Sequence, residues 1–143
     1  KSSLSRHRPK VNLFNRQRKL PVETAPLKEF LHQLSGQMAL ETGFTVVLIS
    51  ELAMKTYNRQ FRGQNRTTDV LAFPDDEDGK EDAYLGDILI CVQTADRQRN
   101  KTLLEELKLL SLHGLLHLLG HDHHTDGGKM KALERKLRGE FQL

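Results

Sequence analysis

The sequence predicts an α/β (α+β) domain in which a small mixed sheet of about four strands packs with about five helices. Short β-branched or apolar runs typical of strands are interspersed with segments whose leucines recur at helical spacing. The length of 143 residues suits one domain with one modest core, and no internal repeat or long low-complexity linker divides the chain. We therefore expect a single domain over residues 1–143, with residues 1–10 as a flexible basic arm.

Four segments have the composition of strands. They are VNLFN (11–15), FTVVLIS (44–50), DVLAF (69–73) and YLGDILICV (84–92). Pro74 follows the third segment and ends it, since proline cannot donate to a sheet ladder. Gly86 lies inside the fourth segment and indicates a bulge or a close approach of another backbone.

Two helices are expected in the first half of the chain. Apolar residues recur at helical spacing over about 25–41, starting near Pro26, and predict an amphipathic helix. Ser50 is a good N-cap residue and predicts a short helix over 51–60.

Two further helices are expected in the second half. Thr102 and Glu105 form a T-x-x-E capping box, and Gly120 provides the stop about 18 residues later. Leucine lies on nearly every side of this helix, so we expect it to be largely buried. Asp126 predicts the cap of a last amphipathic helix.

The charge distribution is uneven. Residues 1–20 carry seven Lys or Arg and no acid, whereas the remainder holds 15 basic and 19 acidic residues. A basic segment of this kind contacts polyanions such as nucleic acid or is simply a solvated tail. A second basic concentration comprises Arg59, Arg62 and Arg66. No apolar run is long enough to span a membrane, and the single Cys91, expected in the core, suits a reducing compartment.

The stretch HGLLHLLGHDH (113–123) has the spacing of a metal site. His113 and His117 are four residues apart on the long helix, so both imidazoles project from one face. Gly120 turns the chain back, and His123 follows the turn. Three imidazoles in this frame, which is that of the metzincin proteases, can occupy three corners of a tetrahedron around Zn²⁺ and leave the fourth open for water.

Two features limit this interpretation. The histidines could instead be core residues, although buried imidazoles without a metal would need several hydrogen-bond partners. In proteases of this frame the residue after the first histidine is a glutamate that acts as general base, whereas here it is Gly114. Glu106 lies too far along the helix to replace it. His121 and His124 fall outside the frame, and we expect them to face solvent, with replacement or supplementation of a ligand as the alternative.

Three blocks of the sequence resemble the YbeY family of bacterial endoribonucleases that mature ribosomal RNA. HGLLHLLGHDH (113–123) is similar to the zinc signature of the family. YNRQFRGQNRTTDVLAFP (57–74) resembles its arginine-containing TDVLSFP segment, and LGDILIC (85–91) resembles its GD strand. In this order the resemblance extends over roughly residues 44–137. The chain departs from the pattern at Thr67 (usually proline), Ala72 (usually serine) and His121 (often aromatic).

The resemblance implies a zincin-like fold and a single-strand-specific, metal-dependent endoribonuclease. Such an enzyme acts in the cytoplasm in 3′-end maturation of small-subunit ribosomal RNA and in ribosome quality control. One Zn²⁺ per chain would be held at the end of the long helix by His113, His117 and His123. The expected partners are ribosomal RNA in the small subunit and ribosomal proteins, with no membrane and with a monomer as the default state.

The resemblance also makes Arg62 a functional residue that faces the metal. A guanidinium can hold a phosphate through two parallel hydrogen bonds and offset developing charge. The alternative to a functional role for Arg62 is a surface salt bridge. We therefore predict Arg62 and His113 as catalytic residues, and Arg59 and Arg66 as additional RNA contacts.

Four aspartates are candidate supporting groups. Asp122 and Asp126 are candidates for orienting an imidazole or a water, and Asp69 and Asp87 for supporting the metal ligands or for organising the backbone. Two rival functions stay open. The metzincin frame favours a zinc peptidase or another metallohydrolase, which Gly114 disfavours. The other rival is a non-enzymatic ribosome-binding module in which the metal braces the fold.

Overall fold

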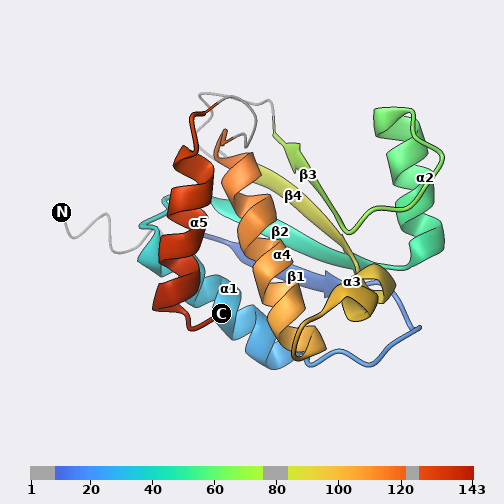
Figure 1. Ribbon diagram of the computed structural model, residues 1–143, viewed down its shortest axis with the longest axis horizontal. Coiled ribbons are helices and arrows are strands. Elements are labelled where there is room, and N and C mark those ends of the chain that lie inside the picture. The colour runs from blue at the N-terminus through green and yellow to red at the C-terminus, as the bar shows by residue number, and fades with distance from the viewer. Residues whose placement is uncertain (1–8, 76–83, 122–125) are drawn as a thin grey trace.

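The computed structural model describes residues 9–75, 84–121 and 126–143 (Figure 1). Within these ranges four strands form one sheet and five helices pack with it, which confirms the predicted fold class. In chain order the elements are β1 (Val11–Asn15), α1 (Thr24–Gln37), β2 (Gly43–Ile49), α2 (Glu51–Arg62), β3 (Val70–Pro74), β4 (Tyr84–Cys91), α3 (Val92–Gln98), α4 (Leu103–Leu118) and α5 (Lys129–Glu140).

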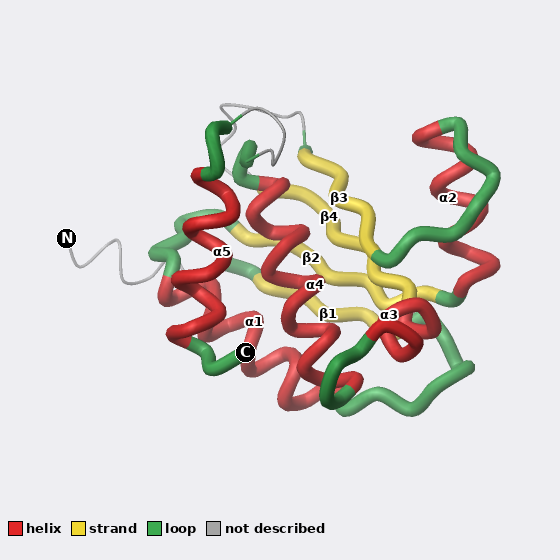
Figure 2. The backbone as a smooth tube through the Cα atoms, viewed as in Figure 1, coloured by secondary structure: helices red, strands yellow, loops and turns green. Residues whose placement is uncertain are grey.

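The sheet is mixed, with strand order β1-β2-β4-β3 (Figure 2). β1, β2 and β4 run parallel, and β3 pairs antiparallel with β4 at the edge. In β4 three residues advance from Tyr84 to Asp87 while β2 advances two, so β4 contains a bulge at Gly86. A Cβ at Gly86 would lie 2.2 Å from the carbonyl oxygen of Phe73, which confirms the close approach predicted there.

The two faces of the sheet are covered differently. Helices α1, α4 and α5 lie on one side of it (Figure 1), where Val46, Ile88 and Ile90 join the leucines of α1 and α4 in the larger core. On the other face Met54 of α2 packs with a smaller buried cluster that includes Leu89 and Cys91. The active-site candidates on α4 therefore rest on the main core of the molecule.

Helix α4 forms as the sequence predicts. The Thr102 hydroxyl accepts a hydrogen bond from the Glu105 amide at 3.1 Å, so the predicted cap is confirmed. Gly120 has a φ of +91°, its amide donates to the His117 carbonyl, and the His121 amide donates to the Leu116 carbonyl. This pair of bonds is a Schellman motif, and it ends the helix two residues before the glycine.

Several predicted boundaries are wrong. Helix α1 ends at Gln37 rather than near residue 41, and α2 runs on to Arg62, where Gly63 closes it with a φ of +67°. The fourth strand stops at Cys91, because Val92 and Ala95 bury their side chains from the separate short helix α3. Strands and helices can both bury the residues of a short apolar run. The apolar residues up to Val92 therefore did not show where the strand ends and the helix begins.

The start of α5 also differs from the prediction. The N-cap is Gly128 rather than Asp126. Asp126 nevertheless caps the helix from two residues further back, since its carboxylate accepts from the Met130 amide at 2.8 Å and the Gly128 amide at 3.0 Å.

Residues 1–10 were predicted to form a flexible basic arm. Most of the predicted flexible arm lies outside the described residues, but Lys10 already belongs to the sheet region, where its carbonyl accepts from the Phe44 amide at 3.2 Å. That residues 1–143 form one domain stays a prediction.

Among the described helices, none combines the length and hydropathy that crossing a bilayer requires.

Candidate active site

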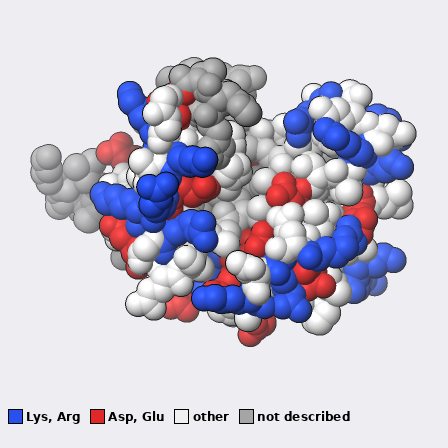
Figure 3. Space-filling view, viewed as in Figure 1, with Lys and Arg blue, Asp and Glu red and all other residues white. Residues whose placement is uncertain are grey.

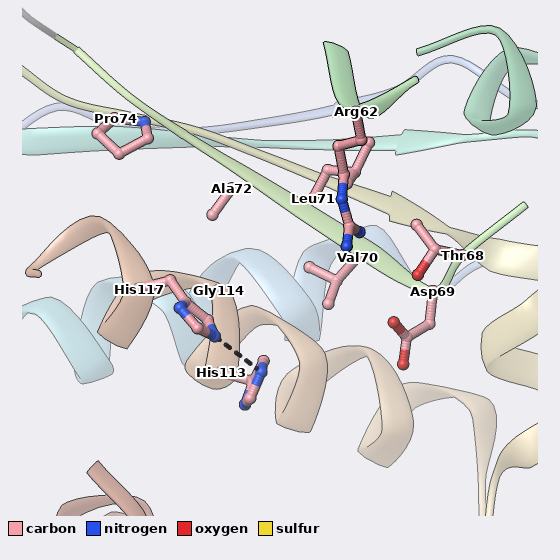
Figure 4. Close-up of a pocket in the computed structure, with 10 residues that line it drawn as sticks. All are labelled: Arg62, Thr68, Asp69, Val70, Leu71, Ala72, Pro74, His113, Gly114 and His117. Atoms are coloured by element: carbon pink, nitrogen blue, oxygen red, sulfur yellow. Dashed lines mark hydrogen bonds between the residues drawn. The ribbon is translucent and has the colours of Figure 1, made fainter. Parts of the chain in front are cut away.

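His113 and His117 lie one turn apart near the end of α4 and face each other (Figure 4). Their Nε2 atoms are 3.1 Å apart, and their rings are inclined at 72°. Two nitrogens bound to one tetrahedral Zn²⁺ at about 2.0–2.1 Å would be separated by about 3.3 Å. The two imidazoles therefore have the spacing of neighbouring ligands of a single ion.

His113 is also held from behind by Glu134 of α5. Its Nδ1 lies 2.9 Å from Glu134 Oε2, and the two side chains are 29% and 20% exposed. Metal-bound histidines commonly donate their second ring N–H to a carboxylate in this way. Glu134 is not among the residues predicted from the sequence. The available signal was its place on the apolar face of α5, four residues after buried Met130 and three before buried Leu137.

The third predicted ligand, His123, lies outside the described residues, as do Asp122 and His124. In the part of the chain that the structure describes, no group of three or more His, Cys, Asp or Glu side chains is arranged to hold a metal ion. The facing Nε2 atoms and the carboxylate behind one of them fit zinc in donor type and spacing. Zinc binding itself stays a prediction.

Gly114 has a packing reason to be glycine. A Cβ at this position would lie 2.6 Å from Cγ2 of Ile88, because α4 presses directly on β4 here. A β-branched side chain such as Ile88 cannot swing aside easily. A glutamate base of the protease type therefore has no room at position 114.

Arg62 reaches the same site from the opposite side. A cavity of about 480 Å³ is lined by Arg62, Thr68, Asp69, His113, Gly114 and His117, together with residues of β3. Figure 4 shows the Arg62 side chain extending from the end of α2 along β3 toward α4. Arg62 and the histidine pair thus border one cavity. This arrangement is what binding of a phosphate by Arg62 next to the histidines requires.

Asp69 borders this cavity together with Arg62 and the histidines. Its carboxylate accepts from Gln98 Nε2 at 3.1 Å, and the same amide group donates to Glu106 at 2.9 Å. The structure therefore brings Asp69 to the site, in keeping with its selection as a supporting group. Glu106 borders a neighbouring pocket and not this cavity.

The other predicted RNA contacts, Arg59 and Arg66, are exposed and do not line the cavity. Arg66 Nε donates to Gln64 at 3.0 Å. Both belong to the basic surface around α2, where Figure 3 shows Lys and Arg side chains gathered. They can contact a longer substrate but not its reacting centre.

Of the two roles predicted for Asp87, support of the metal ligands is wrong. It pairs with Phe73 in the sheet and lines a pocket on the face opposite α4, where its carboxylate accepts from the Tyr84 hydroxyl at 2.6 Å. Side chains alternate between the two faces of a strand. Because Ile88 contacts α4, its neighbour Asp87 points away from the site. Burial, with the Asp87 hydrogen bond next in importance, raises the pKa of Tyr84 to about 12.

Asp126 caps the start of α5, and His123, the predicted ligand nearest to it in sequence, lies outside the described residues. Among the described histidines, Asp126 lies beside His121, whose Nδ1 is 4.0 Å from Asp126 Oδ2. Desolvation acts to raise the pKa of Asp126, but hydrogen bonds from the amides of Met130, Gly128 and Lys129 outweigh it and keep this pKa below its usual value. The carboxylate therefore caps the helix, and its predicted role in orienting an imidazole or a water stays a prediction. The His121 side chain, predicted to face solvent, is 31% exposed.

Comparison with known proteins bears on both fold and activity. Residues 12–142 match the family described as "Endoribonuclease YbeY". A protein of that name from Koribacter versatilis is 43% identical over 125 residues, which cover 85% of this chain and 80% of the relative. Its counterpart from Solibacter usitatus is 35% identical over 120 residues, covering 82% and 78%.

A solved structure is similar as well. The solution structure of TM1509 from Thermotoga maritima superposes with a TM-score of 0.59 at 32% identity, over 93% of this chain and 92% of that one. The sequence match, the shared fold and the histidine pair facing an arginine across one cavity agree with one another. The chain belongs to the YbeY family of endoribonucleases.

Proposed function

We propose that this protein is a zinc-dependent, single-strand-specific endoribonuclease that acts in the cytoplasm on small-subunit ribosomal RNA, in 3′-end maturation and ribosome quality control. Membership of an endoribonuclease family supports RNA cleavage. The observation that carries the proposal is the cavity that Arg62 shares with His113 and His117. A cation on one wall and a pair of metal-ligating nitrogens on the other suit a phosphodiester group between them.

His113, His117 and His123 would hold the zinc ion. When bound, zinc supplies Lewis-acid chemistry for phosphodiester cleavage. The facing Nε2 atoms of the first two histidines supply two of the nitrogen donors without rearrangement of α4. The chain beyond the Gly120 turn supplies the third.

Arg62 binds and orients the scissile phosphate. Its planar guanidinium donates two parallel hydrogen bonds to phosphate oxygens and offsets the negative charge that develops on them. Gly63 in a left-handed conformation ends α2 immediately after Arg62, so the side chain leaves the helix at the rim of the cavity. Asp69, which accepts a hydrogen bond from Gln98, lines the same cavity as this guanidinium and the histidine pair.

The basic surface around α2 would bind the RNA on either side of the cleaved bond. Arg59 and Arg66 are placed for such contacts outside the cavity. Contacts of this kind act through phosphate charge, so they weaken as salt rises. We expect Arg59→Ala to raise KM for RNA at physiological salt while kcat changes little.

The peptidase alternative is disfavoured by the packing at Gly114. A peptidase of this histidine frame needs a carboxylate on the residue after the first histidine. The 2.6 Å approach of a Cβ at this position to Ile88 leaves no space for it. The ribosome-binding module with a structural metal differs from our proposal only in lacking cleavage, so an activity assay separates the two.

The test uses purified protein with its metal content measured, incubated with single-stranded RNA and with an unstructured peptide. Wild type should cleave the RNA and leave the peptide intact. His117→Ala should abolish cleavage, and Arg62→Ala should lower kcat by about 10²–10³-fold, as expected for loss of one charge-stabilising donor. Circular dichroism verifies that each variant is folded, and Arg135→Ala, an exposed change on α5, is the matched arginine control. RNA cleavage that persists in folded His117→Ala would show that a contaminating nuclease is responsible and would overturn the proposal.

A further inference from the structure

The contact between Glu134 and His113 joins two helices that are distant in sequence. Helix α5 packs against α4, and the carboxylate of Glu134 meets the ring nitrogen of His113 that points away from His117. The two residues are 21 positions apart, so the contact depends on how the helices pack and not on local chain geometry. Both side chains are shielded from bulk water to a large extent.

The position of Glu134 is set by the core and not by the histidine. Met130 and Leu137, on the same face of α5, are 0% and 3% exposed and belong to the main hydrophobic core. Asp126 caps the start of the helix. Because these groups fix α5 without the carboxylate, Glu134 can act as a rigid support for the imidazole.

A carboxylate at Nδ1 determines which nitrogen of His113 carries the proton. A neutral imidazole has one N–H and one lone pair, and an ionised carboxylate only accepts hydrogen bonds. The proton therefore resides on Nδ1 and is donated to Glu134, and the lone pair resides on Nε2. That lone pair faces Nε2 of His117 at 3.1 Å, which is where a shared metal ion would be bound.

We propose that Glu134 is the positioning residue of the metal centre, which holds His113 in the Nδ1–H tautomer and aims its Nε2 at the metal. This inference rests on the proposed function, since it concerns the same metal site. Glu134 does not line the cavity that Arg62 shares with the histidine pair, so we expect it to act through His113 and not on the substrate. Its negative charge also makes the imidazole a stronger donor to a cation.

The experiment compares Glu134→Ala and Glu134→Gln with the wild type and with Glu140→Gln, an exposed change on the same helix whose carboxylate contacts Gln37 and not His113. Zinc affinity is measured by competition with a chromophoric chelator. We expect Glu134→Ala to bind zinc about 10–100-fold more weakly, the usual loss when such a partner is removed. Glu134→Gln should recover part of this loss, because its amide oxygen still accepts the Nδ1–H, and Glu140→Gln should match the wild type.

The tautomer is measured separately on the metal-free protein by long-range ¹H–¹⁵N correlation of the histidine rings. In the wild type the His113 pattern should be that of a protonated Nδ1 and an unprotonated Nε2, and in Glu134→Ala it should shift toward the other tautomer. A purely structural role for Glu134 would not move this pattern in a variant that melts like the wild type.

The two readouts separate the inference from the function on which it rests. If the wild type binds no zinc, the proposed function fails and this inference fails with it. If the wild type binds zinc and Glu134→Ala binds it equally well with an unchanged His113 pattern, only the positioning role is overturned. If affinity and tautomer change together in a folded variant, the positioning role is supported.

Discussion

At residue 114 the backbone of α4 comes so close to β4 that no side chain fits between them. This contact sets the depth at which the histidine pair lies, because His113 precedes Gly114 directly and His117 follows one turn later on the same helix. A residue larger than glycine would push that stretch of α4 away from Ile88. The histidines would then move relative to Arg62, which is carried by a different element across the cavity.

A substitution at this glycine tests the packing argument. We expect Gly114→Ala to lower the free energy of unfolding by up to about 2 kcal/mol, since overpacking a core costs about 1–3 kcal/mol and the better helix propensity of alanine returns about 1 kcal/mol. Gly36→Ala is the matched control, because Gly36 also lies in a helix but its Cβ would meet nothing within 4 Å. That control should gain up to about 1 kcal/mol. Urea denaturation measures both, and equal gains in the two variants would contradict the close packing.

At the scale of elements, the carboxylate of Asp126 caps the start of α5. Asp126 accepts hydrogen bonds from the amides of Gly128 and Met130, beside the positive end of the helix dipole. Its pKa is lowered in the folded protein. A carboxyl with a lowered folded pKa contributes stability that is present above its unfolded pKa and is lost as the pH falls through the folded pKa.

Acid denaturation of Asp126→Asn should show this contribution. At pH 6 the variant should unfold at a lower urea concentration than the wild type, because a neutral amide accepts these hydrogen bonds less strongly. As the pH falls below the usual aspartate value of about 3.9, the difference should shrink toward zero, since Asp126 becomes protonated as well. Asp96→Asn, a change at a surface ion pair with Arg99, is the control. A difference that stays constant from pH 6 to pH 2.5 would argue against the capping role.

The elements also show what sequence patterns can and cannot reveal. Caps and stops are chemical signals within a few residues, so Ser50, Thr102 and Gly120 were found correctly. The partner of His113 could not be found in this way, because Glu134 meets it only through the packing of α5 on α4. The face of the sheet on which Asp87 lies could not be predicted for the same reason. The sequence shows that Asp87 follows Gly86, but the face it occupies depends on strand register.

At the scale of the whole molecule, the cavity collects residues from segments far apart in the chain. Arg62 ends α2, Asp69 precedes β3, the histidine pair lies on α4, and Glu134 on α5 supports it from behind. The motif spacing predicted the histidine pair, and the family resemblance predicted Arg62. Spacing alone could not show that these groups border one cavity, because that depends on how the edge strand β3 and α4 lie together.

Metal binding should therefore stabilise the whole fold. A ligand that binds only the folded state at 100 times its Kd adds about 2.7 kcal/mol. We expect a chelator to lower the Tm of the zinc-loaded wild type by several degrees and to leave the Tm of His117→Ala unchanged. Differential scanning calorimetry checks this, with zinc and chelator concentrations fixed. An equal chelator effect on both proteins would mean that the stabilising metal is bound elsewhere.

The dependence of His113 on α5 has a consequence for synthesis on the ribosome. A nascent chain interrupted before Lys129 would contain Arg62 and both helical histidines, but it would lack the carboxylate at position 134 and the buried Met130 and Leu137 that seat it. Such a fragment would expose leucines of α4 and carry an unsupported imidazole. The histidine pair therefore takes its supported form only after the segment that contains α5 has been synthesised and has folded onto α4.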